Sequence, residues 1–106
     1  MTELCSIEDI DEGFARGFRI DGGQTLFLVR KNNEFFGYIN NCPHAGWPLN
    51  LLPDKFLSLD KEYIQCSNHM ALFEISSGVC VDGPCVGAGL QKLDLEIING
   101  CIHLKA

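Results

Sequence analysis

The chain has 106 residues, of which 46% are hydrophobic and 21% charged, values typical of a single globular domain with its own core. Its net charge of −6 repels the phosphates of nucleic acids and of anionic lipids, so we expect neither nucleic acid nor a membrane as a partner. No basic leader and no apolar run of roughly 18 residues is present, from which we expect a cytoplasmic protein without a membrane span.

Short runs with an apolar residue at every second position, separated by glycine, asparagine and proline, predict an all-β domain without long helices. Three hairpins are predicted, each from two such runs joined by residues that suit a turn. They are Thr25–Lys31 with Glu34–Ile39 across Asn32-Asn33, residues 73–75 with 78–81 across Ser76-Ser77, and residues 93–98 with Cys101–Leu104 across Asn99-Gly100.

The uncharged segment 40–53 differs from the predicted strands because it contains three prolines and a glycine. This composition predicts a loop. Such an irregular backbone cannot form many of its own hydrogen bonds, so other contacts must hold it in place, and a bound metal centre is one candidate.

Six cysteines in a chain without an export signal favour reduced thiols that bind metal over a disulfide framework. Two motifs supply suitable ligands. Cys42-Pro-His44 and Cys66-Ser-Asn-His69 each offer one thiolate and one imidazole, with 21 residues between His44 and Cys66. Two turns that face each other could hold either a single ion or a cluster between them.

A single zinc ion is the simpler interpretation, because two cysteines and two histidines satisfy its tetrahedral preference. Zinc fingers, however, usually pair cysteine with cysteine and histidine with histidine, whereas each motif here mixes the two. Mixed pairs suit two metal atoms better. In a [2Fe–2S] cluster with two cysteines on one iron and two histidines on the other, each loop contributes one ligand to each iron.

The runs CPHAGWPL (42–49) and CSNHMALF (66–73) resemble the two cluster-binding motifs of Rieske iron–sulfur proteins. Gly83-Pro84 resembles the proline loop that covers the cluster in that family. The resemblance implies one [2Fe–2S] cluster per chain, with Cys42 and Cys66 on one iron and His44 and His69 on the other. It also implies a Rieske-like antiparallel β-sandwich in which residues 1–106 form one domain, with a smaller cluster-binding subdomain of two loops at about 40–85.

The same resemblance implies a soluble one-electron carrier, not an enzyme, that passes electrons from a flavin reductase to a terminal oxygenase or a similar redox enzyme. Two alternatives stay open at this point. One is a small or regulatory Rieske subunit of a larger reductase, similar to that of nitrite reductases, and the other is a structural zinc module. The chain itself is too poor in histidine to be an oxygenase, because His103 alone cannot complete a second iron site.

Four positions suggest a low-potential branch of this family. Trp47 and Asn68 stand where high-potential members carry a disulfide between the loops, and Ala71 and Phe73 stand where those members carry a serine and a tyrosine. Without these hydroxyl donors we expect a potential of about −150 to 0 mV. Trp47 and Phe73 either exclude water from the cluster or simply fill the core.

Two features depart from the family pattern. Met70 stands where the family usually has glycine, and the long separation of the motifs suggests a surface flap at 51–57. Cys5, Cys80, Cys85 and Cys101 are expected to be buried thiols, although Cys80 and Cys85 could approach each other across a turn. His103 is expected to be an ordinary strand residue.

Overall fold

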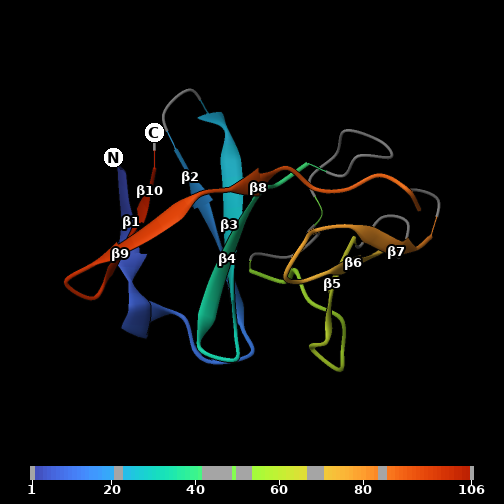
Figure 1. Ribbon diagram of the computed structural model, residues 1–106, viewed down its shortest axis with the longest axis horizontal. Helices are drawn as coiled ribbons and strands as arrows, with labels where there is room; N and C mark the ends of the chain where they lie inside the picture. Colours follow the sequence, from blue (N-terminus) through green and yellow to red (C-terminus); the bar gives the residue numbers. More distant parts are fainter. Residues whose placement is uncertain are drawn as a thin grey trace.

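The computed structural model describes residues 2–20, 23–41, 49, 54–66, 71–83 and 86–105. Within these residues the chain forms ten β-strands, one short 3₁₀ helix (η1, Ile7–Asp9) and no α-helix. The strands build three antiparallel sheets, and Figure 1 shows the four-stranded sheet between the two three-stranded ones. The predicted all-β class is confirmed. None of the described residues belongs to a helix long and apolar enough to cross a membrane.

The central sheet has the strand order β2-β3-β4-β8. Its long hairpin, β3 with β4, is confirmed with the predicted ends. The two asparagines of the turn, Asn32 and Asn33, both have positive φ (54° and 61°), which asparagine tolerates. The strands of this sheet are β2 (Ala15–Arg19), β3 (Thr25–Lys31), β4 (Glu34–Ile39) and β8 (Lys92–Leu93).

The second sheet brings the two ends of the described chain together in the order β1-β10-β9, with β1 at Thr2–Ser6, β9 at Leu95–Ile98 and β10 at Cys101–Leu104. The turn at Asn99-Gly100 is confirmed. The prediction of one strand over 93–98 is wrong, because the chain changes sheets at Asp94. The carbonyl of Asp94 accepts a hydrogen bond from the backbone N–H of Lys105 (3.0 Å), beyond the end of β10.

The third sheet has the order β5-β6-β7, with β5 at Tyr63–Gln65, β6 at Leu72–Glu74 and β7 at Cys80–Asp82. The predicted hairpin is confirmed, but its turn is longer than the predicted Ser76-Ser77 pair. The N–H of Gly78 donates to the carbonyl of Glu74 (2.7 Å), and the N–H of Glu74 donates to the carbonyl of Val79 (2.9 Å). The chain therefore turns over residues 75–78, and Gly78 supplies the positive φ of 77°.

Two hydrophobic cores lie on opposite faces of the central sheet. Strand β3 contributes to both, because successive side chains of a strand point to opposite faces. Its Phe27 and Val29 face the third sheet, and its Leu26 and Leu28 face the second. The larger core also holds Tyr38, Leu49, Phe56, Ile64, Cys66, Ala71, Phe73, Ile75, Cys80 and Leu90; the smaller core holds Cys5, Ile10 and Ile102.

The prediction of a surface flap at 51–57 is wrong for the part of it that the structure describes, residues 54–57. Residues 51–53 lie outside the described part of the chain, but Phe56 is only 1% exposed and stacks on Phe27, with ring centroids 4.4 Å apart and ring planes 9° from parallel. Asp54 fixes the start of this segment, because its carboxylate accepts a hydrogen bond from the N–H of Gly17 in β2 (2.7 Å). The segment between the motifs is therefore partly core.

Candidate metal centre

The four predicted ligands fall into two groups. Cys42, His44 and His69 lie outside the described residues. Cys66 is described: it directly follows β5, and its side chain is fully buried in the larger core. We call residues 41–48, which carry Cys42 and His44, the first ligand segment, and residues 66–70, which carry Cys66 and His69, the second. The geometry of the site can be built from Cys66 and from the described residues that flank these two segments.

The second ligand segment is closed at its base by strand pairing. Ile64 in β5 pairs with Phe73 in β6, and beyond the last pair the N–H of Cys66 donates to the carbonyl of Ala71 (2.9 Å). Residues 66 and 71 thus face each other across the start of the segment that carries His69. This hydrogen bond fixes the distance between the two described residues that flank the segment.

The first ligand segment begins where β4 ends, and its base is closed by a side chain. The carboxamide Oδ1 of Asn40 accepts a hydrogen bond from the N–H of Leu49 (2.8 Å), so the amide bridges residues 40 and 49. Leu49 is fully buried in the same core as Cys66. Leu49, at the end of the first segment, and Cys66 and Ala71, at the ends of the second, are therefore members of one core.

A third segment approaches the base of the second one. Gly83 follows β7 with a φ of 104°, and a Cβ atom at this position would lie 2.8 Å from the Cα of Ala71. Only glycine permits this contact, since real Cβ atoms do not approach backbone so closely. Pro84 lies outside the described residues, so its resemblance to the family's proline loop stays a prediction. Gly83 therefore brings the end of β7 against Ala71, at the base of the second ligand segment.

The surroundings of Cys66 are apolar. Ala71 and Phe73, the positions at which hydroxyl donors would raise a cluster potential, are both fully buried and carry no hydroxyl group. An ionised sulfur in such surroundings is costly unless a cation binds it. A metal-bound thiolate therefore fits this position, and sulfur with imidazole is a donor set that suits iron–sulfur clusters and zinc alike. Trp47, Asn68 and Met70 lie outside the described residues.

The other described cysteines lie within strands. Cys5 in β1 is buried in the smaller core, and burial, followed by the charge of Asp9, raises the pKa of its thiol. Cys80 in β7 is also buried, with its Sγ 3.3 Å from the carbonyl oxygen of Asp82. Cys101 is half-buried in β10. Cys85 lies outside the described residues, so its pairing with Cys80 stays a prediction.

His103 is a residue of β10, as expected. Its Nδ1 lies 3.2 Å from the carbonyl oxygen of Cys101, and its Nε2 lies 3.7 Å from a carboxylate oxygen of Glu3 on the neighbouring strand. In the described part of the chain, no three histidine, cysteine or acidic side chains come close enough together to hold a metal ion. A second metal site among these residues therefore has no support.

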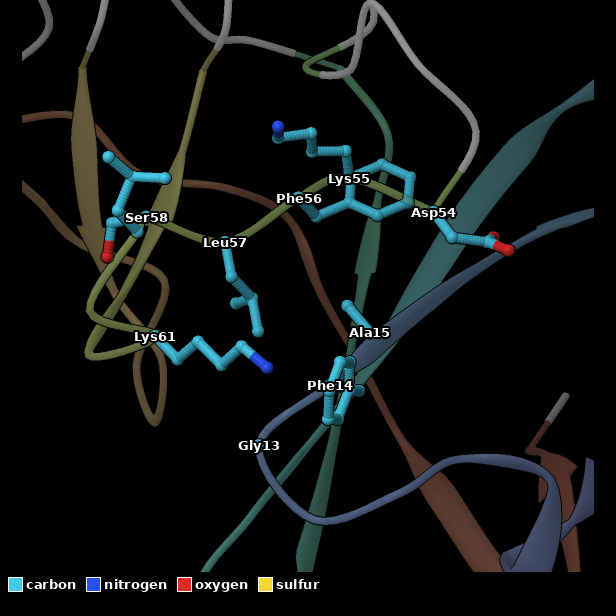
Figure 2. Close-up of a pocket in the computed structure, with 10 residues that line it drawn as sticks. Gly13, Phe14, Ala15, Asp54, Lys55, Phe56, Leu57, Ser58 and Lys61 are labelled. Carbon is cyan, nitrogen blue, oxygen red and sulfur yellow. The ribbon is translucent and has the colours of Figure 1, made fainter.

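A cleft of about 270 Å³ opens on the side of the molecule, between residues 13–15 and 54–61 (Figure 2). Phe14 and Leu57 form apolar walls, and the ammonium of Lys61 points at Phe14, 3.2 Å from the centre of its ring. Sequence reasoning missed this cleft, because its two sides are about forty residues apart and neither carries a motif. Among the described residues that line the cleft there is no thiol and no imidazole.

Comparisons with known proteins agree with this geometry. The family model of the Rieske [2Fe-2S] domain matches residues 1–104. Apoptosis-inducing factor 3 of Homo sapiens is 31% identical over 103 residues, which cover 97% of this chain but only 16% of that protein's length. The ferredoxin component of the p-cumate 2,3-dioxygenase system of Pseudomonas putida is 32% identical over 85 residues, 80% of this chain and 69% of that protein.

Two solved structures share the fold. The complex of reduced oxygenase and oxidized ferredoxin in carbazole 1,9a-dioxygenase contains a chain that superposes with a TM-score of 0.80 at 22% identity, over 96% of this chain and 89% of that one. The ferredoxin of carbazole 1,9a-dioxygenase from Nocardioides aromaticivorans gives 0.76 at 21% identity, over 98% and 97%. At this level of identity the likeness shows the architecture alone.

Proposed function

This chain belongs to the family of Rieske [2Fe–2S] domains, and we propose that it is a one-electron carrier rather than an enzyme. We assign one cluster per chain to four ligands, with Cys42 and Cys66 on one iron and His44 and His69 on the other. The observation that supports this assignment is that Leu49, next to the first ligand segment, and Cys66, in the second, are both fully buried in one core.

The ligand set decides how easily the carrier accepts its electron. When bound, the cluster supplies a site that takes up and releases one electron. Two neutral imidazoles in place of two thiolates leave less negative charge on the oxidised centre, which raises the potential from about −400 mV into the range of about −150 to +300 mV. Ala71 and Phe73 donate no side-chain hydrogen bond that would stabilise the reduced centre. We therefore place the potential at about −150 to 0 mV.

The partners follow from the carrier role. We propose a terminal oxygenase as electron acceptor and a flavin reductase as donor, supported by the similarity to the p-cumate system's ferredoxin component. We further propose that residues at about 40–85 act as a cluster-binding subdomain on a basal β-domain. A cytoplasmic location would keep the two ligand cysteines reduced until the cluster is inserted.

A second candidate is a subunit or module of a larger reductase. The observation in its favour is that the relative in Homo sapiens matches this chain over only 16% of its own length, so a domain of this kind also occurs within a longer protein. Firm co-purification with a large catalytic chain would favour this candidate, whereas a monomeric, freely diffusing protein would favour the carrier.

The test is a metal and sulfide assay on protein made with ample iron, combined with a visible spectrum. We expect about two iron and two acid-labile sulfide ions per chain and a reddish-brown colour. The variant Cys66→Ser, which preserves side-chain size, should lose most of the iron while remaining folded by circular dichroism. Cys101→Ser is the matched control, because this half-buried thiol lies in β10, and it should retain the iron. A colourless protein with one zinc ion per chain would overturn the proposal in favour of the structural module.

A further inference from the structure

One buried phenol connects the central sheet to the third sheet. Tyr38 lies in β4, is fully buried, and donates its O–H to the backbone carbonyl of Ile75, in the turn that joins β6 to β7. Strand β4 pairs with β3 and β8 but with no strand of the third sheet. The phenol therefore connects two sheets that are not joined by strand pairing among the described residues.

The same turn also packs directly on the Tyr38 ring. A Cβ atom at Gly78 would lie 2.6 Å from Cε1 of the ring, so the turn reaches this distance only because the residue is glycine. The carbonyl of Gly78 in addition accepts a hydrogen bond from the N–H of Leu90 (2.8 Å). On its other side the ring meets Phe27, with centroids 5.8 Å apart. The turn is thus held by the hydroxyl and by the face of the ring together.

This contact joins β4, which precedes the first ligand segment, to the turn that follows β6, the strand after the second ligand segment. Tyr38 precedes Asn40, whose side chain closes the first segment, by two residues. Ile75 directly follows β6, the strand that begins where the second segment ends at Ala71. One hydrogen bond therefore joins the strand that leads into the first ligand segment to the strand that leads out of the second.

We propose that Tyr38 is a positioning residue for the metal centre: its hydrogen bond to Ile75 fixes the two ligand segments relative to each other. This inference rests on the proposed function, since it needs a cluster held by both segments. The phenol itself binds no metal. It acts through the carbonyl of Ile75 and the backbone that continues from it to the second segment.

Tyr38→Phe tests the hydroxyl alone, because phenylalanine keeps the ring beneath Gly78 and beside Phe27. The buried carbonyl of Ile75 then loses this donor, and the turn should open more often. We expect the loaded variant to release iron to a chelator about tenfold faster than the wild type. Its midpoint potential should shift from the wild-type value, because the ligand segments are then no longer fixed relative to each other.

Two control variants separate positioning from general stability. Tyr63→Phe removes a phenol from the exposed face of β5, three residues before Cys66, where the side chain is 38% exposed. Ile102→Val removes one methylene from the smaller core on the opposite face of the central sheet. Neither touches the contact of Tyr38 with the turn. Both variants should keep the wild-type potential. Under conditions in which Ile102→Val and Tyr38→Phe have the same free energy of unfolding, Ile102→Val should release iron more slowly.

The outcomes are distinct. A faster release of iron and a shifted potential in Tyr38→Phe alone would support the positioning role. A wild-type potential in Tyr38→Phe, with iron release no faster than in Ile102→Val at equal stability, would overturn it while leaving the carrier function intact. Wild-type protein that binds no iron under the loading conditions would instead overturn the proposed function, and the positioning role with it.

Discussion

Tyr38 shows at the scale of a single residue how burial decides protonation. Removal from water, together with the negative charge of nearby Glu74, raises the pKa of its phenol from 10.0 to about 12. The neutral form is the one that can donate to Ile75. The hydrogen bond between the sheets therefore persists through the physiological range and well into alkaline solution.

This raised pKa predicts a stability difference with a defined pH range. The neutral phenol is favoured in the folded protein, so its contribution is complete below pH 10 and is lost as the pH rises towards about 12. We expect wild-type protein to exceed Tyr38→Phe in free energy of unfolding by about 1 to 3 kcal/mol at pH 8. Urea titrations at increasing pH should show this difference shrinking above pH 10. A difference that grew in alkaline solution would contradict the assignment.

At the scale of elements, the segment between the ligand motifs is anchored by aromatic packing. Phe56 stacks on Phe27 of β3, and the carbonyl of Phe56 accepts a hydrogen bond from the N–H of Gln65 in β5 (2.8 Å). The segment thus connects the central sheet to β5, the strand that directly precedes Cys66. In contrast, Leu59 lies on the turn that follows and is 95% exposed.

These environments predict opposite effects for two alanine substitutions. Phe56→Ala should lower the free energy of unfolding by about 3 to 5 kcal/mol, because it leaves a cavity beside Phe27. Leu59→Ala should change it by no more than about 0.5 kcal/mol. Thermal or urea unfolding of both variants measures this. If Phe56→Ala proved as mild as Leu59→Ala, the segment would be the surface flap that the sequence suggested.

The accuracy of the sequence predictions depended on how local their physical causes are. The turns at Asn32-Asn33 and Asn99-Gly100 were predicted correctly, because positive φ is a property of the residues in the turn. The turn at 75–78 was predicted to contain only Ser76 and Ser77. That Gly78 belongs to it could not be seen locally, because the close contact that requires a glycine there is with Tyr38, forty residues earlier. The break at Asp94 was missed for a similar reason: it depends on which sheet each half of the run joins.

The candidate site was predictable to the extent that motif spacing determines it. Spacing and ligand type indicated Cys42, His44, Cys66 and His69 without any knowledge of the fold, and the family they indicated is confirmed. Spacing could not indicate which residues close each ligand segment. The side chain of Asn40 closes the first segment at Leu49, and the carbonyl of Ala71 closes the second at Cys66, yet neither Asn40 nor Ala71 is a metal ligand by residue type.

At the scale of the whole molecule, the two cores have different tasks. The larger core contains Cys66, Ala71 and Leu49 beside the ligand segments, whereas the smaller one joins β1 and β10 to the central sheet. Metal binding contributes folding free energy to the part that forms the site. The half of the molecule around the larger core should therefore depend on the cluster, and the half around the smaller core should not.

Removal of the metal tests this division. Amide hydrogen exchange of loaded and metal-free protein should show that exchange speeds up in β5, β6 and β7 when iron is removed. The amides that pair β1 with β10 should change little, since these strands belong to a different sheet from β5, β6 and β7. Equal acceleration throughout the described strands would mean that the molecule responds as one unit.

The central claim, that two histidines bind one iron of a [2Fe–2S] cluster, is tested most directly by pulsed electron paramagnetic resonance of the reduced protein labelled with ¹⁵N-histidine. We predict strong nitrogen couplings from His44 and His69, of which one disappears in His44→Cys and the other in His69→Cys. His103→Gln, in β10, should leave both couplings unchanged. An iron-loaded, paramagnetic protein without any coupling to labelled nitrogen would contradict the account.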